Sequence, residues 1–427
     1  MGRLIGGWLR RRWHLVVLAA WAAVWFAILA PGGGIAWKFF VQGTDLLFTG
    51  HDGGSVHPGG LHLYASYPQL QIGPAAYAAA GLLRRAGPDY GMTAAQLVMT
   101  ALGLLVLAMT GQIALAARPD LARRPGRVRW YLLVAGAFFV IAWQVMAVAF
   151  GHLDDALALT CTMAAVWVWV TRPLRLPARA ALTGTLIGLA AAAKPWAFVF
   201  LPVICLPAAA QPVTYLNGDQ AGAGPDRLGP ARARARDRAI ALGGVALVTV
   251  AAWLPFFAAD PGTVHAMHYQ IANMPDSALR ALGVTAGRTP PWDRAAQIVL
   301  GCVLGLLAIA RRRWAAVLLL GAGARIALDP GVHKYYTPEV MAGALLWELV
   351  GMRRPLPLWT VTGFAALNLV PKLTSDAAVQ GDIRLGLVVA FTAAVLLAPS
   401  GLHRHPGLAT EPDVPDHPDE YARPAAG

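Results

Sequence analysis

The chain has 427 residues, of which 57% are hydrophobic and only 13% are charged, and its mean hydropathy is +0.52. A soluble protein carries roughly 25% charged residues, so this composition excludes a soluble multidomain protein. It indicates instead an all-α polytopic membrane protein, in which apolar segments long enough to cross a bilayer alternate with short polar connections.

Reading from the N-terminus, we expect a bundle of about twelve membrane-spanning helices. The expected spans are residues 15–37, 92–117, 131–150, 155–171, 180–193, 196–210, 239–258, 295–310, 315–328, 338–351, 356–371 and 385–399. The first span follows a basic segment, as in a secretory signal, but a proline directly follows its only candidate cleavage site, so we interpret it as retained. The apolar stretch 69–83 is predicted to be a short helix at the outer leaflet, since a full span there would place the Arg-rich segment 118–129 outside.

The formal net charge of +13 reflects membrane topology. Most Lys and Arg residues fall in segments on one side of the predicted spans, including the Gly, Pro and Arg-rich linker 211–238. By the positive-inside rule this side is cytoplasmic, which predicts a multi-pass membrane protein with both termini inside and no nucleic-acid partner. We expect residues 1–399 to form one transmembrane domain and residues 400–427 to be a disordered cytoplasmic tail.

Polar side chains gather at the outer ends of the predicted spans. In chain order they include Asp45, Asp52 and Tyr67; His152, Asp154 and Asp155; Lys194; and Arg325, Asp329, His333, Lys334, Tyr335, Tyr336 and Glu339. Each group alone is equally consistent with a solvated turn. Four such groups on the same face favour one outward-facing cavity that combines acids, imidazoles and cations.

Such a cavity suits transfer of a phosphate-activated group from a lipid carrier. A carboxylate such as Asp45 can accept the proton of an attacking hydroxyl. The cations that could stabilise a departing lipid phosphate are Lys194, Arg325, His333 and Lys334. A lipid-linked leaving group would lie at the depth of these residues.

Here the sequence resembles the GT-C membrane glycosyltransferases, and among them the bacterial polyprenyl-phosphate-mannose-dependent mannosyltransferases. The resemblance lies in GTDLLF around Asp45, LHLYASYPQLQIGPAAY at 61–77, GHLDDALAL at 151–159, GTLIGLAAAAKPWAFVFLP at 184–202 and HKYYTPE at 333–339. It implies an N-in bundle, an outward active site, and a polyprenyl-phosphate sugar donor, with mannose as the sugar and a cell-envelope lipid or glycan as the acceptor.

The resemblance also implies roles for individual residues. An acid in the first outer loop is the general base for inversion at the sugar carbon, which places Asp45 in that role. Lys194 and His333 approach the donor phosphate, and the GHLDD turn lines the site. An insertion in the first loop brings a second acid, Asp52, so both acids remain candidates for the base.

Neither a metal nor another cofactor is expected. Some GT-C members use a divalent ion at the donor phosphate, but no residue pair here has a spacing such as H-E-x-x-H, and a divalent ion remains only an alternative. His265 and His268 are interpreted as solvated loop residues. Cys161, Cys205 and Cys302 are interpreted as small core residues without a disulfide.

Two other functions compete with the glycosyltransferase. The first is a transporter or lipid-carrier flippase, which should place charges near the bilayer midplane of several spans. The predicted spans are nearly free of charge except close to their ends, which favours the enzyme. The second is a related protein that has lost its activity and acts as a scaffold.

Overall fold

The structure is a computed structural model that describes residues 2–50, 58–87, 91–206 and 230–398. Within these ranges the chain is helical, with one isolated β-bridge between Ala272 and Arg288. The all-α architecture predicted from composition is therefore confirmed. Asp52, most of the predicted 211–238 linker and the tail 400–427 lie outside the described residues.

Eight helices in the described ranges are long and apolar enough to cross a membrane. These helices are α1 (Gly2–Leu29), α5 (Gly91–Ala117), α7 (Pro125–Gln144), α8 (Leu153–Thr171), α9 (Leu176–Ala193), α10 (Pro230–Ala259), α13 (Asp293–Ala310) and α18 (Ala377–Leu397). Their number and hydropathy are those of a multi-pass membrane protein.

The other four predicted spans coincide with shorter or interrupted helical segments. They are η4 (Pro195–Cys205); η8 (Trp314–Ala316) with α14 (Val317–Leu328); α15 (Thr337–Leu346) with the π-helical turn η10 (Trp347–Gly351); and α16 (Leu358–Phe364) with η11 (Ala365–Leu369) and α17 (Val370–Leu373). Nearly every residue of α14 and α15 is buried. These two helices therefore form the interior of the bundle and present little surface to lipid.

Short helices occupy several connections between the long helices. They are η1 (Ala30–Gly32), α2 (Trp37–Thr49), η2 (Gly60–His62), α3 (Leu63–Ser66), α4 (Pro74–Arg84), η7 (Pro261–Thr263), α11 (Val264–Met267), α12 (Ala278–Ala281) and η9 (Lys334–Tyr336). Two further elements, α6 (Pro119–Ala122) and the π-helical turn η3 (Val145–Phe150), adjoin α7.

Helix α2 lies where the sequence predicted a loop around Asp45. It forms because its apolar residues recur at helical spacing, so that Trp37, Phe40 and Thr44 are buried on one face. It ends at Gly50, whose φ of +81° is a left-handed conformation that favours glycine. Asp45 is thus held on a regular helix beside α4.

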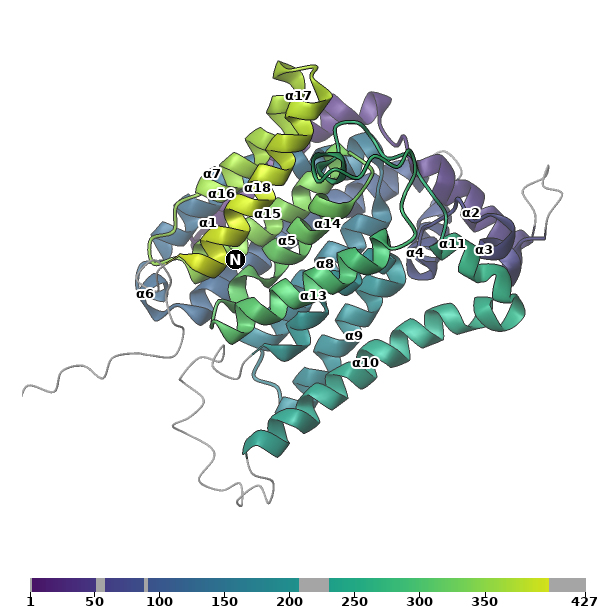
Figure 1. Ribbon diagram of the computed structural model, residues 1–427. Coiled ribbons are helices and arrows are strands. Elements are labelled where there is room, and N and C mark those ends of the chain that lie inside the picture. The colour runs from purple at the N-terminus through teal and green to yellow at the C-terminus, as the bar shows by residue number, and fades with distance from the viewer. Residues whose placement is uncertain (1, 51–57, 88–90, 207–229, 399–427) are drawn as a thin grey trace, which may run out of the picture.

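The long helices pack side by side around α14 and α15 (Figure 1). Helix α10 runs along α9 at one edge of the bundle, whereas α1 packs against α7 at another. The elements α2, α3, α4 and α11 gather at one end of the bundle in Figure 1. This arrangement brings together the N-terminal ends of α8 and α15 and the C-terminal ends of α9 and α14.

Candidate functional site

The GHLDD turn begins helix α8 with three polar side chains. Gly151 has a φ of +74°, a conformation that a side-chain-bearing residue rarely adopts, and it turns the chain from η3 into α8. His152 then occupies the position before the helix, and Asp154 and Asp155 lie in its first turn. Both carboxylates are fully buried. The N-terminal end of a helix favours negative charge, which partly offsets the cost of burying them.

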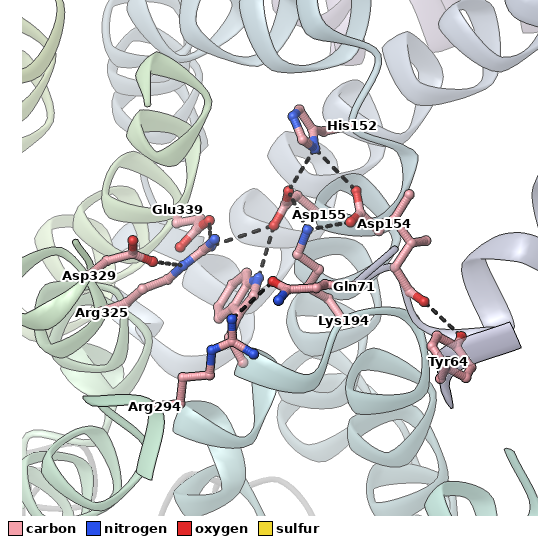
Figure 2. Close-up of polar contacts among 12 residues, drawn as sticks. Tyr64, Gln71, His152, Asp154, Asp155, Lys194, Arg294, Arg325, Asp329 and Glu339 are labelled. Atoms are coloured by element: carbon pink, nitrogen blue, oxygen red, sulfur yellow. Dashed lines mark hydrogen bonds and ion pairs between the residues drawn. The ribbon is translucent and has the colours of Figure 1, made fainter. Parts of the chain in front are cut away.

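Lys194 compensates these carboxylates from the end of α9 (Figure 2). Its ammonium group donates to Asp154 Oδ2 and lies 3.4 Å from Asp155 Oδ2. Burial of the amine opposes its charge, but the two carboxylates outweigh this effect and raise the pKa of Lys194. His152 Nδ1 completes the group, 3.4 Å from Asp154 Oδ1 and 3.3 Å from Asp155 Oδ2.

Arg325, in the last turn of α14, links this group to α15. Its Nη1 donates to Glu339 and lies 3.5 Å from Asp155 Oδ1, and its Nε lies 3.7 Å from Asp329 Oδ2. The rings of Trp196 and Tyr336 lie 4.1 and 4.0 Å from its guanidinium carbon. With its side chain only 4% exposed, Arg325 is placed to orient the surrounding acids rather than to contact a ligand directly.

A stack of three rings connects the GHLDD turn with the HKYY segment. Tyr335 lies between two imidazoles, with centroid distances of 3.8 Å to His152 and 4.7 Å to His333. Partial burial, together with the nearby cations and His152, lowers the pKa of His333 to about 4. The imidazole of His333 is therefore neutral at pH 7 and offers one N–H donor.

The structure thus brings seven of the predicted site residues into one charge cluster. They are His152, Asp154, Asp155, Lys194, Arg325, His333 and Tyr336. Lys194 and His333, which were predicted to meet, both belong to this cluster. They are linked indirectly, because Lys194 and His152 both contact Asp154, and the ring of Tyr335 lies near both His152 and His333. Lys334 is exposed beside it, and Tyr67 is buried.

Asp45 has different neighbours. Arg84 on α4 donates to both of its carboxylate oxygens, at 2.7 and 3.3 Å, and also to Thr44. The Asp45 side chain is 38% exposed. None of the contacts seen among the described residues joins Asp45 to the charge cluster.

Sequence reasoning assigned no role to several members of the charge cluster. Glu339, Asp329 and Tyr335 stood in a segment already noted as polar, but no pattern distinguished them from solvated residues. Trp196, whose indole N–H donates to Asp155 at 2.9 Å, follows Lys194 in the KPW sequence and was assigned no role.

Arg294 was also missed, because it lies on α13 far from any motif. It donates to Gln71 Oε1 at 3.0 Å (Figure 2). It also donates to the backbone carbonyls of Met267 and Tyr269. These bonds tie the segment before α4 to the connection between α10 and α13. Arg294 therefore holds these two connections together.

Three residues could hold a metal ion. Ligand atoms of His152, Asp154 and Asp155 lie within 4.8 Å of one another, and this is the group of suitable geometry found among the described residues. The oxygen-rich donor set suits a hard divalent cation. However, the ammonium group of Lys194 already contacts both carboxylates, so a metal ion would compete with a resident cation.

The formal charges of the cluster do not balance. Four carboxylates face two permanent cations, Lys194 and Arg325. Burial raises the pKa of Asp329. Because the carboxylates of the cluster outnumber its permanent cations, an added anion would be accommodated best if protons or a divalent cation entered with it.

Comparisons with known proteins give little further information. No family model matches the chain, and no curated protein matches it. Among solved structures it is similar to ArnT from Cupriavidus metallidurans in the apo state, with 15% identity, a TM-score of 0.47, and coverage of 92% of this chain and 77% of that one. It is also similar to the same protein bound to undecaprenyl phosphate, with 14% identity, a TM-score of 0.44, and coverage of 91% and 77%. A likeness at this level does not assign the chain to a family.

Proposed function

We propose that this protein is a membrane glycosyltransferase that moves a sugar from a polyprenyl-phosphate donor to a lipid or glycan acceptor at the outer face of the membrane. The observation that carries the proposal is the position of the charge cluster. Asp154, Asp155 and Glu339 lie in first helical turns, Arg325 lies in a last turn, and Lys194 directly follows a helix. All these helix ends meet on one side of the bundle, and we propose that this side lies at the depth of a lipid headgroup.

The opposite helix ends support an outward-facing site. They carry Arg residues at the start of α7, at both ends of the α8–α9 connection, after α13 and after η10. These residues are Arg127, Arg129, Arg172, Arg175, Arg179, Arg311, Arg312, Arg313, Arg353 and Arg354. The positive-inside rule places this end in the cytoplasm and the charge cluster at the outer face.

The proposed reaction follows from the charges. A hydroxyl oxygen of the acceptor attacks the anomeric carbon, the bond from that carbon to the phosphate oxygen breaks, and the phosphate leaves with the electron pair. The leaving phosphate gains negative charge as the bond breaks, so Lys194 stabilises the transition state more than the ground state. His333 can donate a hydrogen bond to the same phosphate, while Arg325 holds the acids in place.

Asp45 is our candidate for the base that receives the proton of the acceptor. A carboxylate has about four lone-pair positions, and Arg84 occupies two of those on Asp45, so a proton can still be accepted. Asp52 is the alternative base. Mannose is our proposed sugar on the strength of the sequence motifs, and we expect no metal requirement because Lys194 already supplies a cation at the carboxylates.

The competing proposal is a flippase for the same lipid carrier. The test is to reconstitute the purified protein in liposomes and supply radiolabelled polyprenyl-phosphate mannose, glucose and arabinose in turn, with cell-envelope lipids as acceptors. The glycosyltransferase predicts a labelled product from one donor and release of polyprenyl phosphate. Movement of a chemically unchanged lipid across the bilayer without product would contradict it and favour the flippase.

A further inference from the structure

A cavity of about 120 Å³ lies beside the charge cluster. A single water needs roughly 10–15 Å³ of such volume, so the cavity can hold several waters or one ligand the size of a sugar ring. Its polar lining comes from Asp276, Asp329, His333, Lys334, Thr337 and Arg384. Asp276 and Arg384 lie outside the polar segments noted in the sequence.

The charges that line the cavity balance. Asp276 and Asp329 face Lys334 and Arg384, and Arg384 Nη1 pairs with Asp276 Oδ2 at 3.1 Å. His333 adds a neutral imidazole. A phosphate or carboxylate entering here would meet two acids, and an ammonium ion would meet two cations. A neutral polyhydroxyl group would instead find both acceptors and donors for its hydroxyls.

The remaining wall of the cavity is apolar. Ile326, Val332 and Leu367 contribute aliphatic surface opposite the polar groups. A sugar ring presents C–H groups on its faces and hydroxyls around its edge, so a small pocket with an apolar wall and a few placed polar groups fits it.

The cavity adjoins the proposed phosphate site directly. Tyr336 lines it and also lies 4.0 Å from the guanidinium carbon of Arg325, and Asp329 lines it and lies 3.7 Å from Arg325 Nε. His333 belongs to both the cavity and the ring stack. A ligand in the cavity is therefore next to a phosphate bound at the charge cluster.

We propose that this cavity binds one neutral sugar ring of the reaction, either the sugar carried by the donor or the terminal sugar of the acceptor. The inference rests on the proposed function, because the glycosyltransferase reaction is what requires a sugar at this place. Its direct test measures sugar binding without turnover, so that it can fail or succeed independently of that function.

The test uses protein in nanodiscs of phosphatidylglycerol and phosphatidylethanolamine, free of sugar-based detergent. Saturation-transfer NMR would report binding of methyl α-D-mannopyranoside, with inorganic phosphate as the anionic comparison. Val332→Trp fills the cavity, Val332→Ala leaves it open, and Val299→Trp adds the same ring to a lipid-facing position on α13 that is 61% exposed. We expect the glycoside signal to fall at least five-fold in Val332→Trp only.

Equal glycoside signals in Val332→Trp and the unchanged protein would overturn the proposal. Binding of inorganic phosphate to the unchanged protein that is lost in Val332→Trp would also overturn it, because the cavity would then bind an anion. Should Val332→Trp fail to fold, Lys334→Met supplies the test, because Lys334 is exposed and its replacement removes a donor without disturbing packing. That variant should weaken glycoside binding several-fold, and unchanged binding would contradict the proposal.

A kinetic measurement then identifies which sugar occupies the cavity. If Val332→Trp raises the KM for the polyprenyl-phosphate sugar, the cavity holds the donor sugar. If it raises the KM for the acceptor and leaves donor hydrolysis unchanged, the cavity holds the acceptor sugar. A protein that shows no transfer with any donor but still binds the glycoside would refute the proposed function and keep the cavity assignment.

Discussion

Replacing Lys194 by methionine should destabilise the protein strongly, because it removes the counter-charge of two buried carboxylates. Breaking a buried ion pair by removing one partner costs about 3–5 kcal/mol. The carboxylates of Asp154 and Asp155 are 0% exposed, whereas the Lys194 side chain is 17% exposed. Water can therefore partly replace the ammonium group, and we expect a loss near the lower limit, about 3 kcal/mol.

The charge origin of this effect can be isolated with a double variant. Asp154→Asn combined with Lys194→Met leaves Asp155 with its partners Arg325 and Trp196, so the double variant should be more stable than Lys194→Met alone. Thermal unfolding in nanodiscs, followed by tryptophan fluorescence, measures the apparent stability. Lys38→Met is the matched control, since Lys38 is an exposed lysine on α2.

The pH dependence of this contribution also follows from the structure. The folded-state pKa of Lys194 is raised above its unfolded value, so its stabilising effect is fully present below the unfolded pKa of about 10.4. It is lost only as pH rises through the folded-state pKa. The stability gap between the protein and Lys194→Met should therefore stay constant between pH 6 and 9. A Lys194→Met variant as stable as Lys38→Met would refute the reasoning.

Four further outcomes are expected. Asp45→Asn should lower turnover by about 10²- to 10⁴-fold, and an active Asp45→Asn protein would indicate that another acid, such as Asp52, is the base. Asp276 is a surface-accessible acid at the cavity, so Asp276→Asn should mainly alter KM. The pKa of His333 is lowered to about 4 in the folded protein, so this residue binds a proton more readily in the unfolded protein. The stability of the protein should therefore fall as pH drops below about 6.5, and it should fall less in His333→Ala. Equal pH profiles for the two proteins would contradict this. Activity should persist in excess EDTA, and loss that Mg²⁺ or Mn²⁺ restores would show that a cation binds at His152, Asp154 and Asp155. A cysteine at Thr285 should react with an impermeant reagent in intact cells and one at Arg354 should not; the reverse pattern would place the site in the cytoplasm.

The sequence was sufficient to predict the helical membrane architecture, because hydropathy reports each apolar segment directly. It was less informative for Trp37–Thr49, because a short apolar pattern in a connection between spans does not by itself distinguish a helix from a loop. It also could not separate complete spans from the short, fully buried helices α14 and α15, since lipid and protein interiors select equally apolar residues.

The candidate site was predictable only in part. Motif order identified Lys194 and the GHLDD turn, and their contact in the structure agrees with a common site. The ion pair of Asp45 with Arg84 and the cavity beside Arg384 depend on contacts between residues distant in the sequence, and no local spacing encodes them. The neutral state of His333 likewise depends on burial and on neighbours from other helices.

The most direct test of a phosphate site at the charge cluster compares the binding of undecaprenyl phosphate and of uncharged undecaprenol to the protein in nanodiscs, by native mass spectrometry. We expect undecaprenyl phosphate to bind at least ten-fold more tightly than undecaprenol, which corresponds to about 1.4 kcal/mol. The Lys38→Met variant should keep this preference, and a folded Lys194→Met variant should lose it. Equal affinity for the two lipids, or a preference for the phosphate that Lys194→Met leaves unchanged, would contradict the account.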